Sequence, residues 1–198
     1  MMIIKTFLLS FLLLSTNVYS QYFGFGFKGG ANSTYFYNGF GKSQTKISPH
    51  FGTITYFGIN HHLGIQLEIL YYRQSAGFSI DSFHFDVKVN YITFPLQLRY
   101  RHPSGFFANI GPQVNMKISQ SLKNTESQEN RSIPWEASEV ECSLTAGVGY
   151  RHPAGLGMEC RYIRSFTKPD VIPETGKAFG FSPNTFQVSL VCLLLFDN

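Results

Sequence analysis

Two neighbouring side chains of this 198-residue chain have the chemistry of a hydrolytic site: His102 and Ser104, within Arg101-His102-Pro103-Ser104-Gly105. A histidine that accepts the serine proton activates the hydroxyl for acyl transfer. The stretch recurs fifty residues later as Arg151-His152-Pro153-Ala154-Gly155, where alanine replaces the serine. Because a turn explains both copies and no orienting group accompanies the pair, we predict no catalytic residue and no enzyme.

Metal or redox chemistry has equally little support in the sequence. The cysteines are Cys142, Cys160 and Cys192, and the histidines outside the repeat are His50, His61, His62 and His84. Neither set has metal-ligand spacing, and the chain lacks a CxxC pair, a phosphate-binding loop and a catalytic triad pattern. The cysteines occupy apolar positions of alternating runs, where cysteine packs as a small hydrophobic residue. We therefore expect no cofactor-binding and no metal-binding residues.

The repeated stretch has the composition of a β-hairpin turn. Pro103 restricts φ to about −65° at the first turn position, and Gly105 supplies the later position that has φ > 0. This combination predicts a three-residue loop that pairs His102 with Phe106. Apolar residues of the flanking strands all have even numbers, and only a loop of this length places them on one face of the sheet.

Alternation of apolar and polar residues predicts eight strands. They span about residues 23–28, 47–59, 63–72, 92–100, 106–118, 139–150, 156–166 and 186–196. Short connections at 60–62, 103–105 and 153–155 alternate with longer ones near 37–46, 75–88, 120–138 and 169–183. The short connections then share one end, as in outer-membrane barrels with short periplasmic turns and long external loops. The predicted fold is all-β: an eight-stranded antiparallel up-and-down transmembrane β-barrel.

The polar face of these strands carries charges of both signs. The charged residues are Lys28, Glu68, Arg99, Lys117, Glu141, Glu159 and Arg161. The predicted register places Arg161 opposite Gly147, and Glu159 opposite Gly149. Long charged side chains that face glycines suit the crowded interior of a small barrel whose apolar face meets lipid. The alternative is a secreted soluble barrel of the lipocalin type, in which the apolar face lines a ligand cavity.

Two prolines lie inside the predicted strands. Pro95 and Pro112 fall on adjacent positions of one strand pair, where each removes a backbone hydrogen-bond donor. A closed barrel has no free edge on which to place them. We therefore expect a local β-bulge at this point.

The first twenty residues have the three parts of a secretory signal peptide. Lys5 precedes an apolar run from Phe7 to Leu14, and Val18-Tyr19-Ser20 offers small residues before a cleavage point at Gln21. We predict a cleaved signal peptide over 1–20 and a barrel domain over 21–198. The net charge of +4 is too small to indicate nucleic acid as a partner.

Several motifs, taken in order, resemble the PorT-like outer-membrane β-barrel family that is common in Bacteroidota. They are Gln66 to Tyr71, Asn90 to Tyr100, Gly111-Pro112-Gln113 and Ala146 to Tyr150. The resemblance covers nearly the whole mature chain and implies an eight-stranded barrel in the cell outer membrane. One member type is tied to type IX secretion, but most have no assigned activity, so the resemblance does not imply that role here.

The resulting hypothesis is a non-enzymatic integral outer-membrane protein with a charge-packed interior and external loops. Its expected partners are outer-membrane lipid, the barrel-insertion machinery that would recognise the alternating last strand ending at Phe196, and a protein or small-molecule ligand at the external loops. Two alternatives stay open: a lipid-modifying membrane enzyme that uses His102 and Ser104, and a soluble ligand-binding barrel.

Overall fold

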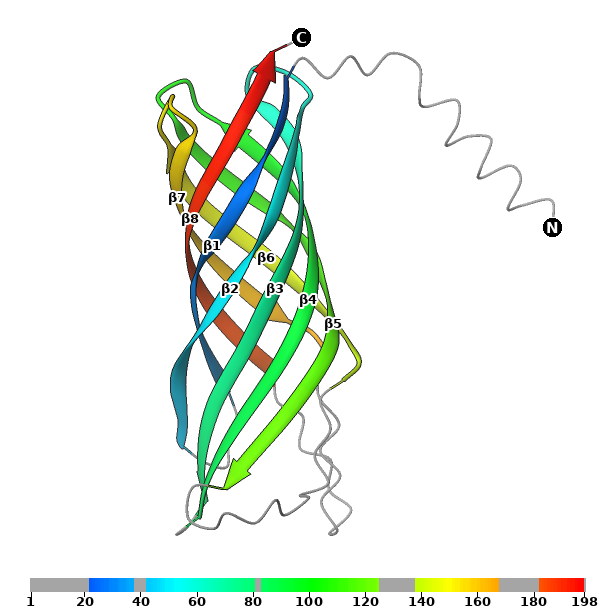
Figure 1. Cartoon of the computed structure of the whole chain (residues 1–198), viewed down its shortest axis with the longest axis vertical. Helices are drawn as coiled ribbons and strands as arrows, with labels where there is room; N and C mark the ends of the chain where they lie inside the picture. Colours follow the sequence, from blue (N-terminus) through cyan, green and yellow to red (C-terminus); the bar gives the residue numbers. More distant parts are fainter. Residues whose placement is uncertain (1–21, 38–41, 81–82, 125–137, 168–181, 198) are drawn as a thin grey trace, which may run out of the picture.

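The chain folds into a closed barrel of eight strands. The computed structural model describes residues 22–37, 42–80, 83–124, 138–167 and 182–197. Each strand pairs antiparallel with the next, and the last pairs with the first (Figure 1). The strands are β1 (Tyr22–Tyr37), β2 (Lys42–Gly58), β3 (Leu63–Ile80), β4 (Phe83–Arg101), β5 (Phe106–Asn124), β6 (Val140–Arg151), β7 (Leu156–Ser165) and β8 (Ser182–Asp197). The predicted fold is confirmed.

The apolar face of the barrel is its outside. Phe27 and Leu190 are 63% and 66% exposed, whereas Glu159 and Arg161, on inward positions, are 0% and 2% exposed. Since successive residues of a strand point to opposite faces, this alternation continues around the whole barrel. A soluble barrel with an apolar cavity would have the reverse arrangement, so that alternative is wrong.

The repeated stretch forms two equivalent turns, as predicted. His102 N donates to Phe106 O (2.8 Å) and Gly105 N donates to His102 O (3.0 Å), and the second copy repeats both bonds. Gly105 and Gly155 have φ values of 95° and 91°. L-residues rarely adopt this left-handed region, so glycine is required at the last position of each loop.

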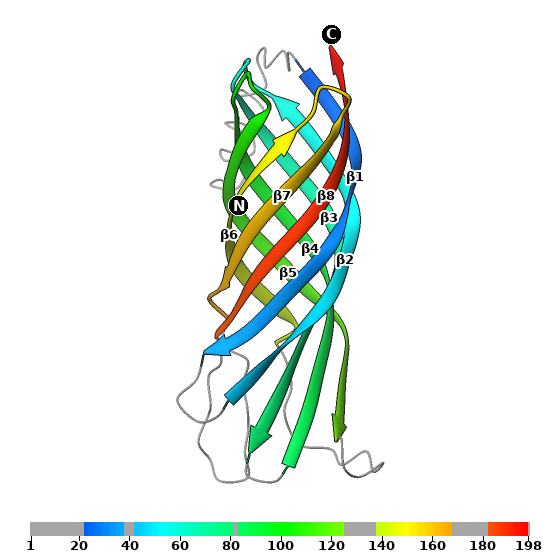
Figure 2. The same cartoon turned by 90° about the vertical axis from the view of Figure 1, so that its left-hand side faces the viewer.

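The three short turns lie at one end of the barrel, together with the start of β1 and the end of β8 (Figures 1 and 2). At the other end the strands are longer than the alternation predicts, and the expected loop near 75–88 is wrong. There β3 continues to Ile80, and β4 begins at Phe83. In β4 the apolar residues have odd numbers from Phe83 to Val89 and even numbers from Ile92 to Tyr100. The register shift between Asn90 and Tyr91 lets one strand contain both parts, which a single alternating pattern does not predict.

The expected bulge beside the two prolines is also wrong. The β4–β5 register is the same on both sides of this point, at Pro95↔Gln113 and Leu98↔Ile110, although the pairing between them is interrupted. The register shift occurs instead between Asn90 and Tyr91. A proline only removes its own hydrogen bond, and the neighbouring rungs hold the register here.

Two predictions fall on residues outside the described ranges. They are the signal peptide over 1–20 and most of the longer connection predicted near 169–183, whose last two residues, Ser182 and Pro183, belong to β8. Within the described residues, no helix is long and apolar enough to cross a membrane.

Candidate functional site in the barrel interior

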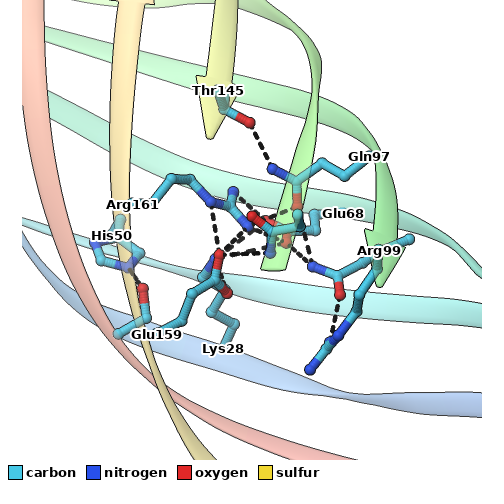
Figure 3. Close-up of polar contacts among 11 residues, drawn as sticks. Lys28, His50, Glu68, Gln97, Arg99, Thr145, Glu159 and Arg161 are labelled. Atoms are coloured by element: carbon cyan, nitrogen blue, oxygen red, sulfur yellow. Dashed lines mark hydrogen bonds and ion pairs between the residues drawn. The ribbon is translucent and has the colours of Figure 1, made fainter. Parts of the chain in front are cut away.

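Four buried charges form an ion-pair cluster in the middle of the barrel (Figure 3). Arg161 donates two hydrogen bonds to Glu68, of 2.7 and 3.0 Å, and its Nε donates to Glu159 Oε1 (2.8 Å). Lys28 Nζ lies 2.9 Å from Glu159 Oε2 and 3.5 Å from Glu68 Oε2. All four side chains are fully buried. Two positive and two negative groups thus compensate one another away from water.

The cluster connects strands that are not neighbours in the sheet. Lys28 is on β1, Glu68 is on β3, and Glu159 and Arg161 are on β7. The Glu68–Arg161 pair therefore crosses the lumen rather than following one strand pair. A bidentate guanidinium–carboxylate pair of this kind has a defined geometry as well as a favourable energy. The cluster therefore spans the lumen between β1, β3 and β7.

Amide side chains surround the ion pairs and satisfy their remaining atoms. Gln97 Oε1 accepts from Arg161 Nη2 (2.8 Å), and Gln97 Nε2 donates to Thr145 Oγ1 (2.5 Å). Asn109 Nδ2 donates to Glu159 Oε1 (3.0 Å). Gln66 Nε2 donates to Glu68 Oε1. Buried charges are stable in a protein only when such additional partners exist.

A third buried cation, Arg99, lies toward the short-turn end of the cluster. Its Nη1 donates to Gln66 Oε1 (2.5 Å), and its Cζ lies 3.5 Å from the centre of the Phe107 ring and 5.8 Å from that of Tyr56. An aromatic face attracts a guanidinium electrostatically. Two aromatic rings and an amide therefore hold Arg99 in place between the ion pairs and the short-turn end.

Two glycines make room for the charged side chains, as the predicted register requires. Gly147 pairs with Arg161 and Gly149 pairs with Glu159. A Cβ atom on Gly147 would lie 2.6 Å from Asn109 Oδ1, and one on Gly149 would lie 2.3 Å from Phe107 Cζ. Larger residues at these positions would collide with the interior side chains. The two β6 glycines are therefore required for the charged side chains to fit inside the barrel.

The remaining predicted interior charges lie on the long-connection side of the cluster. Glu141 is 5% exposed and accepts from Asn115 Nδ2 (2.9 Å) and Ser143 Oγ (3.2 Å). Lys117 is inward by register but only half-buried. All seven charged residues expected on the inner face are thus on that face.

His102 and Ser104, the hydrolytic candidates, lie on the exposed rim of the barrel. Ser104 Oγ is 2.7 Å from His102 Nδ1, and Ser104 N also donates to His102 Nδ1 (3.2 Å). In the sister turn, Ala154 N donates to His152 Nδ1 at the same distance. The histidine therefore caps the turn backbone in both copies, with or without a serine. The two residues are brought together by a turn rather than by a catalytic cleft.

The cysteines lie on the outer face, as expected: Cys142, Cys160 and Cys192 are all exposed and free. In the part of the chain that the structure describes, no three His, Cys, Asp or Glu side chains converge to hold a metal ion.

Sequence reasoning identified the inward charges but not their partners. Parity alone marks Gln66, Gln97, Asn109 and Thr145 as inward polar residues, and it also marks His50, whose Nε2 lies 2.9 Å from Ser189 Oγ. A run of polar residues at every second position of apolar strands is the signal that would have found the whole network. Pairing across the lumen has no signal in the sequence.

The fold and its outward apolar face define an integral outer-membrane β-barrel. The chain belongs to the outer membrane protein beta-barrel domain family, whose model matches residues 15–170. The protein is accordingly located in the outer membrane, where the exposed apolar face contacts lipid. Among curated proteins none matches the sequence.

Solved structures of outer-membrane proteins share the fold. OprG from Pseudomonas aeruginosa is 10% identical, with a TM-score of 0.51 over 88% of this chain and 96% of its own. Ail of Yersinia pestis, in complex with the heparin analogue sucrose octasulfate, is 12% identical, with a TM-score of 0.50 over 87% of this chain and 99% of its own. At these identities the likeness concerns the fold alone.

Proposed function

We propose that this protein is a non-enzymatic outer-membrane barrel that conducts no solute and acts through its external connections. The observation that carries the proposal is the ion pair between Glu68 and Arg161, which crosses the lumen with both side chains fully buried. A channel for solutes needs a continuous polar path, and this pair with its amide partners occupies that path. The interior therefore holds the barrel together, and binding falls to the surfaces outside the bilayer.

The strand lengths support binding at the end opposite the short turns. A bilayer-spanning strand needs about 9–11 residues. β3, β4 and β5 have 18, 19 and 19 residues and extend furthest at that end (Figures 1 and 2). Short turns face the periplasm in barrels of this class. The extended ends of β3, β4 and β5 would then project outside the cell, and we call this projecting part the ledge.

The partner at this ledge is a protein or a small molecule rather than a polyanion. The connections at this end contain both acidic and basic residues. One has Glu126, Glu129 and Arg131, and another has Lys168, Asp170, Glu174 and Lys177. A nucleic acid or a sulfated sugar would select a surface of one positive sign. Mixed charge supports specific contacts with a folded partner.

Three further features belong to the same proposal. A signal peptide over 1–20 would export the chain, and the alternating residues of β8 would be recognised by the barrel-insertion machinery. The motif order described above supports membership of the PorT-like group of Bacteroidota. A secretion-associated role would follow only if loss of the protein changed the set of secreted proteins.

The proposal is tested with the purified barrel in vesicles. We expect no swelling of vesicles in isotonic sugar and no unit conductance in planar bilayers. A steady conductance in the unmodified protein would contradict the closed interior. In cells, a deletion strain should keep its lipid A acylation pattern, and an altered pattern would instead favour the lipid-modifying enzyme.

A further inference from the structure

The outer face of the barrel carries a groove with a floor of small side chains. Ala108 on β5, Ala146 on β6 and Cys160 on β7 line this groove, whose volume is about 660 Å³. Ala108 and Cys160 lie on one rung, each paired with Val148 of β6. Two alanines and a cysteine lower the surface here, since most other outward positions carry larger apolar residues.

Large apolar side chains form the two walls of the groove. Leu98 and Tyr100 of β4 form one wall, and they are 50% and 46% exposed. Tyr162 of β7 and Phe186 of β8 form the other, with ring centres 5.1 Å apart. A flexible hydrocarbon chain gains many dispersion contacts in such a trough, whereas on a flat surface it touches protein on one side only.

At the short-turn end the groove adjoins a second cavity, which we call the polar pocket after its residues Asn60, His61 and His62. Leu63 and Tyr100 line both cavities, and the second, of about 440 Å³, is completed by Asn60, His61 and His62. The His62 ring stacks on the Tyr100 ring at 6.0 Å and 14°. Asn60 Oδ1 accepts from His62 N (2.9 Å) and Leu63 N (2.8 Å), which holds the turn in shape. Hydrogen bonds and ring stacking therefore fix the shape of the polar pocket, and Tyr100, an aromatic residue of the membrane interface, lies beside it.

The surroundings of this pocket are basic. Arg101 Nη2 donates to His61 O (3.4 Å), so a guanidinium lies against the turn. The three short turns, over 59–63, 101–105 and 151–155, contain two arginines and no acidic residue, and Asp197 lies at the same end of the barrel, at the end of β8. Basic pockets at the membrane surface attract anionic lipid headgroups. The local charge thus favours a phosphate over an ammonium group.

We propose that the polar pocket and the groove together bind one anionic phospholipid of the leaflet at the short-turn end. Its phosphate would accept hydrogen bonds from His61 and His62, and one acyl chain would lie over Ala108, Ala146 and Cys160. Tyr100 would contact the glycerol region between them. The lipid would thereby be held at a defined position on β3 to β8 rather than exchanging freely around the barrel.

A second groove on the same face serves as an internal comparison. It has a volume of about 730 Å³ and is lined by Phe27, Leu156 and Cys192 among others. It shares no lining residue with the polar pocket of His61 and His62. We expect this groove to accept acyl chains without preference for a headgroup.

The three exposed cysteines give a direct test. Three variants, each retaining only Cys160, Cys192 or Cys142, are placed in a neutral detergent and titrated with phosphatidylglycerol or with phosphatidylcholine of the same chains. The rate of alkylation by a membrane-soluble maleimide reports whether a chain covers the thiol. Phosphatidylglycerol should protect Cys160 saturably, near one lipid per barrel. It should protect Cys192 no better than phosphatidylcholine does, and it should leave Cys142 unchanged. Equal protection of Cys160 by the two lipids, or equal protection of all three thiols by phosphatidylglycerol, would overturn the proposal.

Substitutions separate the two halves of the site. His61→Ala combined with His62→Ala should lower the apparent affinity for phosphatidylglycerol ~10-fold, the loss expected for a hydrogen bond to a charged group. The matched control is His152→Ala, on the same rim but outside the pocket, which should leave the affinity for phosphatidylglycerol unchanged. Ala146→Phe should remove protection of Cys160, and its control is Ala31→Phe on the outer face of β1.

Two further outcomes decide the assignment of the headgroup and the chain. Glycerol phosphate, which has no acyl chains, should not protect Cys160, and protection by it would contradict a chain in the groove. All variants must show the heat-dependent shift of the folded barrel on SDS gels. An unchanged affinity in the folded double histidine variant would overturn the headgroup pocket, independently of whether the barrel conducts solutes.

Discussion

Removing the guanidinium of Arg161 should destabilise the barrel more than any other single change in its interior. Arg161→Met keeps most of the side-chain volume but removes both hydrogen bonds to Glu68 and the contact with Glu159. Glu159 retains Lys28 at 2.9 Å, whereas Glu68 retains it only at 3.5 Å. Breaking a buried pair by removing one partner typically costs about 3–5 kcal/mol. We expect a loss of that size in the free energy of unfolding.

A second substitution should recover much of the loss. Adding Glu68→Gln to Arg161→Met restores a neutral interior, in which Lys28 and Glu159 still form their pair at 2.9 Å. The control is Arg164→Met, on the same strand but exposed on the outer face. An exposed arginine on a lipid-facing strand contributes no buried pair, so its loss should leave stability unchanged or raise it.

The measurement is reversible urea unfolding of the barrel in phospholipid vesicles, followed by far-UV circular dichroism and by the gel shift of the folded form. The reasoning is refuted if Arg161→Met costs under about 1 kcal/mol, the scale of a solvent-exposed ion pair. It is also refuted if the double variant is no more stable than Arg161→Met, because the cost would then come from lost packing rather than from an uncompensated charge.

Three further changes test the packing and the turns. Gly149→Leu should cost about 1–3 kcal/mol by overpacking against Phe107, with Val148→Leu on the outer face as the control; equal urea midpoints would contradict a crowded interior. Gly105→Ala should cost about 1–2 kcal/mol, because its φ of 95° is unfavourable for L-residues, and an unchanged midpoint would argue against this turn geometry. Ser104→Ala should leave folding and lipid A acylation unchanged, as in the sister turn that already has alanine; altered acylation would point to catalysis.

The interior network was only partly predictable. Inward parity placed Glu68, Arg161 and Gln97 on one face, because a strand alternates its side chains between two faces. The β6 glycines opposite Glu159 and Arg161 could also be located, since the three-residue turn sets the β6–β7 register. The start of β4 could not, because its apolar residues change from odd numbers at Phe83 to Val89 to even numbers from Ile92 onward. The register shift between Asn90 and Tyr91 that joins the two parts in one strand has no signal in the sequence.

The order of residues along each strand was enough to predict which face meets lipid and where the three short turns lie. Both depend on local chemistry. Apolar residues alternate along the strands, two of the turns have a proline followed by a glycine with φ > 0, and the third is the polar stretch Asn60-His61-His62. The contacts of Glu68 with Arg161 and of Lys28 with Glu159 are seen only in the folded barrel. These residues lie on strands that are not all neighbours, so barrel closure and the stagger of the strands set their relative heights. The lipid groove has a different origin, because its lining residues come from the consecutive strands β3 to β8 and are aligned by the pairing of neighbouring strands.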